Sequence, residues 1–219
     1  MKFDLHVHSC YSRDSVNRPE TLIRRAKALG IGIAVTDHNT ISAYPKLKKL
    51  GKKNNVNVIC GEEIKVHEEG KFLGELSALF LQEAPKTNEF PGIIDEIKKQ
   101  DALLYAPHPF DVFRKRFRKL DEIAKKLDAI EAFNSRSYFS GFNKKADAYA
   151  DARKICKIAG SDAHFPEEIG RAVTVLKCDD IEGMRKEIKK RNTRIYGEKS
   201  SPIVHFYTAL RTCRILKEV

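Results

Sequence analysis

The sequence predicts an α/β fold built on a parallel sheet. Short apolar runs alternate with amphipathic stretches along the 219 residues, which is the pattern of repeated strand–helix units. About seven such units with short connections favour closure of the sheet into a TIM-like barrel, although an open doubly wound sheet would give the same periodicity. No internal repeat, low-complexity tract or linker interrupts the pattern, so we expect a single domain over residues 1–219.

The expected strands are short runs rich in β-branched and other apolar residues. They cover Lys2–His6, Gly32–Thr36, Val56–Cys60, Ala102–Ala106, Asp128–Phe133, Ile155–Gly160 and Arg171–Leu176. One segment departs from strand–helix alternation, because two further runs flank a Glu-Glu-Gly turn after the third strand. A hairpin is therefore expected from Ile64–His67 and Lys71–Leu81.

The expected helices lie between these strands and have amphipathic spacing. They cover Pro19–Leu29, Tyr44–Lys53, Gly92–Gln100, Leu120–Leu127, Lys144–Lys154, Asp180–Arg191 and Pro202–Leu216. The first of them has Pro in its first turn and stops before Gly30, an asymmetry typical of helix termini.

Composition indicates a soluble globular protein, with 42% hydrophobic and 32% charged residues. No run of about 18 apolar residues is present, so we expect no membrane span. Five scattered cysteines without a CxxC pair, and a first segment (MKFDLHVHS) without an apolar run, predict reduced thiols and a cytoplasmic location. The net charge of +11 favours an anionic partner, although solvated helix faces such as LKKLGKKN would also account for it.

Five of the seven histidines directly follow predicted strands, in DLHVHS, VTDHNT, YAPHPF and AGSDAHF. The carboxyl ends of barrel strands share one mouth, so we expect these side chains to converge there: His6, His8, His38, His108 and His164. His6 and His8 are two residues apart in an extended segment and therefore point to the same side. Asp162 and His164 repeat this spacing.

Carboxylates complete this set. Asp14 follows the first motif, Asp37 precedes His38, and Glu63 follows the third strand in CGEEIKV. Hard oxygen ligands mixed with imidazole suit Mn²⁺, Zn²⁺ or Fe²⁺ and do not suit a thiolate site. Because carboxylates neutralise and bridge cations, the sequence predicts two or three divalent metal ions close together.

These motifs give the chain a specific resemblance to the PHP (polymerase and histidinol phosphatase) family. The resemblance covers essentially the whole chain, from DLHVHS through VTDH, GEE and HPF to GSDAHFPEEIGRA. It implies a distorted (β/α)7 barrel with a trinuclear metal centre, and it supports closure of the sheet.

The resemblance also implies how the ligands are shared among the three ions. The first metal would be held by His6, His8, Glu63 and Asp162, and Glu63 would bridge to a second metal held by His108. The third metal would be held by Asp14, His38 and His164.

Two acidic positions leave alternatives open. Many relatives carry a His where GELSAL places Glu75, and a carboxylate ligand there would favour harder ions such as Mn²⁺. The other interpretation of Glu75 is an exposed hairpin carboxylate. Glu62 would be the alternative bridging residue to Glu63, and in a strand only one of the two can face the mouth.

Metal ions arranged in this way lower the pKa of a bound water and neutralise phosphoryl charge. We therefore expect hydrolysis of a phosphate ester by a metal-activated hydroxide, without a phosphoenzyme, through a catalytic set of His6, His8, Glu63, Asp162 and Asp37. Asp37 is expected to orient a ligand imidazole or a water, with a helix N-cap as the alternative. The sequence contains neither a GxSxG elbow nor a GxxxxGK[ST] loop.

Substrate contacts are expected from a few polar residues near the mouth. Asn134 and Arg136 in EAFNSRS follow a predicted strand, and relatives often have Asn and Arg here. Arg13 and Arg171 are weaker candidates. His67 and His205 lie outside the family motifs and are interpreted as structural or surface residues.

The expected substrate is an anionic phosphorylated molecule, with a nucleotide, nucleoside bisphosphate or short oligonucleotide favoured by the compact chain and its positive charge. Histidinol phosphate is the alternative substrate for the same chemistry. A non-catalytic RNA-binding barrel resembling the archaeal RNase P subunit of this fold is a third interpretation, but that lineage lacks the metal-binding constellation. The oligomeric state is left open.

Overall fold

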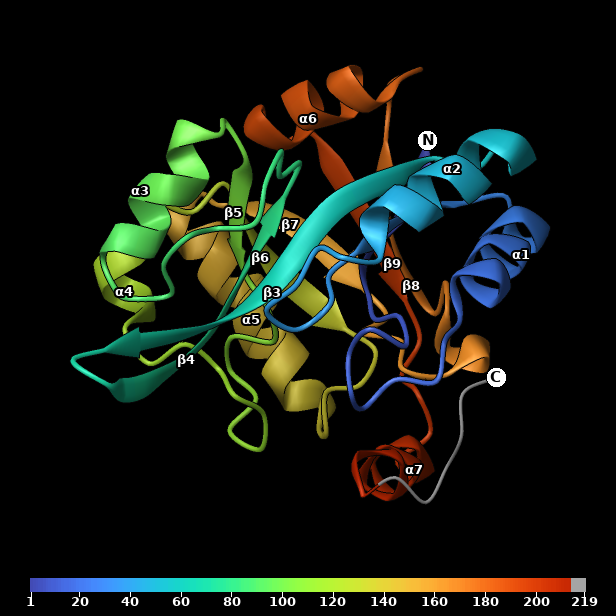
Figure 1. Cartoon of the computed structure of the whole chain (residues 1–219). Coiled ribbons are helices and arrows are strands. Elements are labelled where there is room, and N and C mark those ends of the chain that lie inside the picture. The colour runs from blue at the N-terminus through green and yellow to red at the C-terminus, as the bar shows by residue number, and fades with distance from the viewer. Residues whose placement is uncertain (214–219) are drawn as a thin grey trace.

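A single sheet forms the centre of the molecule in the computed structural model, which describes residues 1–213. In this part of the chain nine strands lie in the order β7-β6-β5-β4-β3-β2-β1-β8-β9 (Figure 1). In chain order they span Lys2–Val7 (β1), Gly32–Val35 (β2), Val58–Glu68 (β3), Lys71–Leu79 (β4), Leu103–Ala106 (β5), Ala129–Asn134 (β6), Cys156–Gly160 (β7), Ala172–Leu176 (β8) and Thr193–Gly197 (β9).

The sheet is mixed, not wholly parallel as the alternation suggested. Strands β1, β2 and β3 pair in parallel, and so do β5, β6 and β7. The predicted hairpin is confirmed, with β4 antiparallel to both β3 and β5. Strand β8 runs antiparallel to β1 and to β9. The short and largely exposed strand β9 was not predicted, because its sequence TRIYG lacks the apolar run of a buried strand.

The sheet curves until its two halves meet, which gives a nearly closed barrel. Ala163, just after β7, pairs in parallel with Val7 of β1. The backbone N–H of Asp162 donates to the carbonyl of His6 (2.7 Å), and that of His8 donates to the carbonyl of Ala163 (3.0 Å). The distorted TIM-like barrel is therefore confirmed over the open sheet. The closure also brings the first and last histidine motifs side by side.

Helices cover the outside and the two ends of the barrel. They span Pro19–Leu29 (α1), Tyr44–Asn54 (α2), Gly92–Lys99 (α3), Leu120–Ile123 (α4), Ser140–Arg153 (α5), Ile181–Lys189 (α6) and Ile203–Thr212 (α7). The prediction for α1 was correct to the residue, whereas α4 is shorter than expected. The predicted end of the last helix at Leu216 lies outside the described residues. In residues 1–213 none of the helices has the length and apolar content needed to cross a bilayer.

The two ends of the barrel differ. Met184 and Ile188 of α6 pack into the same buried cluster as Phe3, Leu5 and other residues that fill the barrel interior. Helix α7 lies at the opposite end (Figure 1). One end is therefore closed by an apolar plug, and the polar strand ends lie at the other.

Candidate metal centre

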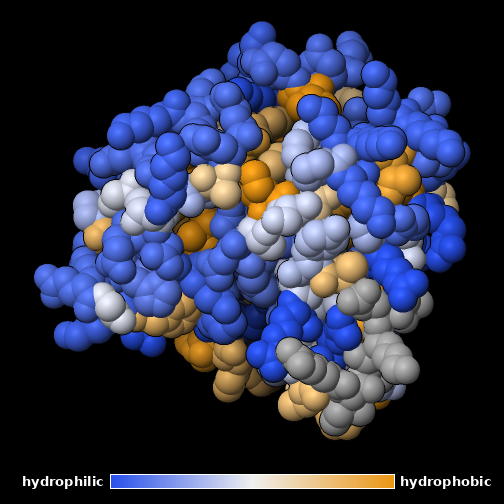
Figure 2. Space-filling model, viewed as in Figure 1, coloured by the Kyte–Doolittle hydropathy of each residue, from blue (hydrophilic) through white to orange (hydrophobic). Residues whose placement is uncertain are grey.

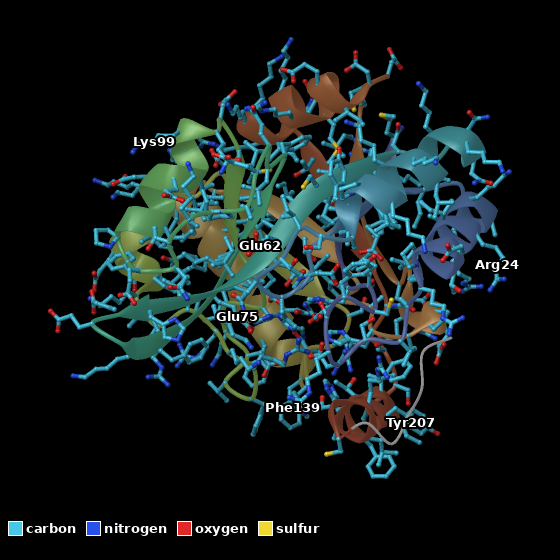
Figure 3. All side chains as sticks on the ribbon, viewed as in Figure 1. Arg24, Glu62, Glu75, Lys99, Phe139 and Tyr207 are labelled. Carbon is cyan, nitrogen blue, oxygen red and sulfur yellow. The ribbon has the colours of Figure 1, made fainter. Side chains whose placement is uncertain are left out.

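A small cavity opens between α7 and the strand ends. Its volume is about 250 Å³, and it is lined by Asp14, His38, Glu75, Phe113, Arg114, Lys115, Arg136, Tyr138, His164, His205, Thr208, Ala209 and Thr212. The remaining predicted ligands are buried: His6, His8, Glu63, His108 and Asp162. Figure 3 labels Glu75, whose side chain comes from β4 of the hairpin.

A register shift in β1 directs its histidines into this site. Phe3 and Leu5 point into the barrel interior, so regular alternation would turn His6 outward. The pairing of β1 with β2 shifts between Asp4 and Val7, as at a β-bulge. Beyond the shift, Val7 packs against the helices, and His6 and His8 both face the site.

The first group of side chains has the spacing of a metal-binding set. The Nε2 atoms of His6 and His8 lie 3.1 Å apart. The carboxylate of Glu63 lies 3.5 Å from the first Nε2 and 3.4 Å from the second, and Asp162 Oδ1 lies 3.7 Å and 3.3 Å from them. Ligand atoms about 2.1 Å from a shared ion are themselves about 3.0–3.4 Å apart in octahedral or tetrahedral geometry, so this set fits one ion.

A second group surrounds the other side of Glu63. His108 Nε2 lies 2.9 Å from Glu63 Oε1 and 3.8 Å from Glu75 Oε2. His38 Nδ1 lies 3.1 Å from Glu63 Oε2 and 3.8 Å from Glu75 Oε1. Glu75 is only 2% exposed, so the alternative of an exposed hairpin carboxylate is wrong. Glu62 points to the other face of β3 and forms no ion pair with a histidine in the described residues.

A third group lies at the cavity wall. Asp14 Oδ2 is 3.3 Å from His38 Nε2 and 3.4 Å from His164 Nε2. The ring of His8 lies between these two histidines, with centroid distances of 4.5 and 4.4 Å. The structure thus brings together all nine predicted ligands, which are the eight that the resemblance implied and Glu75.

The charge balance of the site favours bound cations. Burial alone would raise the pKa values of Glu63 and Asp162, but the neighbouring His and Arg side chains outweigh it and hold both well below the usual range. Burial lowers the pKa of His38, yet Glu63 and Asp14 outweigh this and raise it to about 10. The carboxylates therefore stabilise a positive charge at this position. Several buried carboxylate oxygens accept no hydrogen bond from residues 1–213: Asp14 Oδ1, Glu63 Oε2, Glu75 Oε1 and Asp162 Oδ1. These residues therefore fit divalent metal ions in donor type, spacing and charge.

Glu131 of β6 is a central residue that the sequence did not single out. Its Oε1 lies 2.9 Å from His6 Nδ1, and its Oε2 accepts the backbone N–H of His108 (2.7 Å) and the amide of Asn134 (2.9 Å). A carboxylate on the far nitrogen of a ligand histidine fixes the ring and its tautomer. The available signal was a charged residue in the middle of a mainly apolar strand, AIEAFN.

Gly160 of β7 explains how Glu131 approaches β1 so closely. A Cβ on this glycine would lie 2.3 Å from His6 Cβ and 2.8 Å from Glu131 Oε1. Any larger residue would separate the histidine from its carboxylate partner.

Arg114 and Lys115 are two cations from one loop that line the cavity. Arg114 Nη2 lies 2.5 Å from Asp162 Oδ2, and Lys115 Nζ lies 3.5 Å from Glu75 Oε1. Their loop is anchored on β4, where the N–H of Glu75 donates to the carbonyl of Lys115 (2.7 Å). The sequence FRKRFRK reads equally well as a solvated charged loop, which is why these residues were not predicted.

Two of the four predicted substrate contacts, Asn134 and Arg136, lie at the site, and the other two lie away from the cavity. Arg136 is 2% exposed; its Nε lies 3.3 Å from Glu168 Oε1, and its Nη2 donates to the Val204 carbonyl (3.2 Å), which ties α7 to the barrel. Asn134 is buried and donates to Asp162 Oδ2 (3.1 Å). Arg13 is exposed and is not among the cavity residues, and Arg171 borders a separate surface depression.

Asp37 supports the site through serines and does not contact a histidine ring directly. Its Oδ1 accepts the Ser9 backbone N–H (2.7 Å) and the Ser12 hydroxyl (2.6 Å). The Ser12 oxygen lies 3.3 Å from His8 Nδ1 and accepts the backbone N–H of His38 (3.0 Å). The N-cap alternative is wrong, because α2 begins only at Tyr44.

The two histidines outside the motifs have different positions. His67 lies on the hairpin, away from the cavity, with its Nδ1 3.3 Å from the Asn88 amide. His205 of α7, however, lines the cavity and stacks on Tyr138 at a centroid distance of 4.0 Å. Burial, together with the charges of Arg136 and Arg114, lowers its pKa to about 4.

Comparisons with known proteins agree with this architecture. Residues 4–191 match the PHP domain. An uncharacterised protein of Methanocaldococcus jannaschii is 38% identical over 194 residues, covering 83% of this chain and 75% of its own length. A 5'-3' exoribonuclease of Haemophilus influenzae is 35% identical over 86 residues, which is 39% of this chain and 31% of that protein.

Two solved structures share the fold at low sequence identity. PsfC from Pseudomonas syringae has a TM-score of 0.71 at 18% identity, covering 99% of each chain. A protein of Bifidobacterium adolescentis, described as a candidate metal-dependent phosphoesterase, has a TM-score of 0.64 at 16% identity and covers 86% of this chain and 96% of its own.

Proposed function

Because the chain belongs to the PHP domain family, we propose that it is a metal-dependent phosphoesterase. The observation that supports this most strongly is the first group, in which two imidazole nitrogens and two carboxylates face one another at 3.1–3.7 Å with no solvent exposure. Burying these four polar groups without a cation would cost free energy, because the carboxylate charges would lack full compensation. A bound cation would supply that compensation.

The ligands divide among up to three ions of Mn²⁺, Zn²⁺ or Fe²⁺. The first would be held by His6, His8, Glu63 and Asp162. The second would be held by Glu63, His108 and Glu75, and the third by Asp14, His38 and His164. Ions in these positions supply a water of lowered pKa and neutralise the charge of a phosphoryl group.

The remaining side chains of the site orient these ligands and bind the ester. Glu131 holds His6 with Nε2 free for an ion, and Asp37 holds the loop of His8 through Ser12. Arg114 faces the cavity beside Asp162 and is the cation best placed to bind a phosphate oxygen.

The substrate that the site favours is a phosphate ester of a nucleotide, nucleoside bisphosphate or short oligonucleotide. The cavity of about 250 Å³ is below the usual size of a small-molecule pocket, so the rest of a nucleotide or oligonucleotide would extend onto the surface. Arg114, Lys115 and the net charge of +11 favour a polyanion over a single-phosphate amino alcohol such as histidinol phosphate.

The test is phosphate release from three esters with added Mn²⁺. A nucleoside 3',5'-bisphosphate, a 5'-phosphorylated oligonucleotide and histidinol phosphate would be compared for the wild type, His8→Ala and His67→Ala. The two variants remove the same side chain inside and outside the site, and metal content is measured on each. We expect Mn²⁺-dependent release that is abolished only in His8→Ala, together with loss of bound metal.

Each other outcome has a defined meaning. If histidinol phosphate is hydrolysed best, the proposed substrate would be wrong and the proposed phosphoesterase reaction would stand. Retained turnover in His8→Ala would refute the first metal-binding group. No release from any ester, together with tight RNA binding and no bound metal, would support the non-catalytic barrel instead.

A further inference from the structure

Four aromatic rings form a cluster at the rim of the cavity, called here the Phe113 cluster: Phe113, Tyr138, Phe139 and Phe142. The ring of Phe113 lies 5.2, 5.9 and 6.2 Å from the other three rings in that order. Phe113 and Phe139 are 60% and 59% exposed. Figure 3 labels Phe139 at the lower surface of the view, where Figure 2 shows apolar colouring along the edge of the molecule. Exposed apolar rings gathered in this way mark a binding surface.

The Phe113 cluster is continuous with the candidate metal centre. Phe113 and Tyr138 line the same cavity as Arg114. The two loops that carry them are joined by buried Asp111, which accepts the backbone N–H of Phe113 (3.0 Å) and that of Tyr138 (2.9 Å). A substrate with its phosphate beside Arg114 would therefore have its adjoining group over these rings.

The charges around the Phe113 cluster favour an anionic aromatic ligand. Lys115, Arg116 and Arg118 are exposed on the same loop as Phe113, and Lys199 Nζ donates to the carbonyl of Tyr138 (2.7 Å). Rings interleaved with cations are the surface to which stacked bases and their phosphates bind. An apolar protein partner would leave these cations facing apolar surface.

We propose that the Phe113 cluster stacks against the nucleobase of the substrate while the phosphate enters the cavity. This inference rests on the proposed phosphoesterase function and assigns the group that carries the phosphate. The ligand is a planar base joined to a phosphate, and a mononucleotide and the end of a single strand share this chemistry.

Fluorescence tests the stacking without requiring turnover. The chain contains no Trp, so Phe113→Trp introduces a single reporter. The matched control is Tyr196→Trp on β9, which is similarly exposed at 58% but borders a different surface depression. We expect adenosine 5'-phosphate to quench Phe113→Trp emission, and ribose 5-phosphate to leave it unchanged. Tyr196→Trp should respond to neither ligand.

Kinetics then separates base binding from catalysis. Phe113→Ala or Phe139→Ala should raise KM for adenosine 5'-phosphate roughly tenfold, since about 1.4 kcal/mol of stacking corresponds to that factor. KM for ribose 5-phosphate should not change. Phe113→Leu keeps apolar packing without the ring and should behave like the alanine variant.

Several results would overturn the inference. One is unchanged emission of Phe113→Trp with adenosine 5'-phosphate, and another is an equal change in KM for adenosine 5'-phosphate and ribose 5-phosphate. A third is Phe113→Trp emission that depends on protein concentration and not on ligand, which would make the cluster a contact between copies of the chain. Absence of phosphate release with base-dependent quenching would refute the phosphoesterase function and keep the base-binding surface. Stronger quenching by a 5'-phosphorylated oligonucleotide than by the mononucleotide would identify a strand end as the ligand.

Discussion

Replacing Glu131 by Gln changes one atom of a buried side chain that does not line the cavity of the candidate metal centre, and we expect it to weaken metal binding. A carboxylate oxygen accepts hydrogen bonds, so a His6 ring that binds an ion would carry its proton on Nδ1, 2.9 Å from Glu131 Oε1, and bind through Nε2. The other oxygen accepts from His108 N and the Asn134 amide. A Gln that keeps both of those bonds must turn its NH₂ toward His6. The imidazole would then place its proton on Nε2, where an ion could not bind.

The expected loss follows from this change of tautomer. Removal of such a carboxylate partner of a ligand histidine costs about 10- to 100-fold in metal affinity, or about 1.4–2.8 kcal/mol. A charge-assisted hydrogen bond contributes a similar amount, about 1.5–3 kcal/mol. The loss of metal affinity should therefore exceed the experimental error of a binding titration.

The assay is calorimetric titration of Mn²⁺ into the wild type, Glu131→Gln and Glu62→Gln. Glu62 is the matched control: it is 5% exposed on β3, and its Oε2 has no hydrogen-bond partner among residues 1–213. Only Glu131→Gln should bind Mn²⁺ more weakly. An unchanged affinity in Glu131→Gln would refute the tautomer argument, and an equal loss in Glu62→Gln would show that the effect is not specific to the His6 contact.

Two further predictions follow from charged side chains near the site. Arg114→Ala should raise KM for a phosphate ester by about tenfold to a hundredfold, because it removes one charge-assisted hydrogen bond; steady-state kinetics showing an unchanged KM would exclude a phosphate contact. Burial raises the pKa of Glu62 from 4.5 to about 7, so the stability that its proton contributes is present below pH 4.5 and lost as pH rises through 7. Glu62→Gln should therefore raise the free energy of unfolding in urea by up to about 3 kcal/mol at pH 8 relative to wild type, with no gain near pH 4.5; equal gains at both pH values would contradict this origin.

The order and type of most elements were determined by the sequence alone. Apolar runs such as GIAV and LLYA, in which every residue is buried, predict strands. Pro19 and Gly30 mark the start and end of α1. Strand direction was not readable, because it depends on which strands pair. The antiparallel course of β8 and the presence of β9 were decided by pairing at the sheet edge.

The candidate ligands were predicted from local motifs, whereas the contacts that support them were decided by the tertiary structure. HxH, DH and DxH spacings are short-range patterns, and strand ends of a barrel converge, so the convergence of the histidines could be predicted from the sequence. The full set of nine candidate ligands also needed the resemblance to the PHP family. Glu131, Arg114 and His205 belong to no motif. Only the folded chain places Glu131 beside His6, Arg114 beside Asp162, and His205 at the cavity. Arg136 shows the converse, since a motif position near the mouth is occupied by a buried side chain that binds Glu168 and α7. The physical reason is that a motif fixes where a side chain begins, but burial and partners from distant segments fix what it contacts.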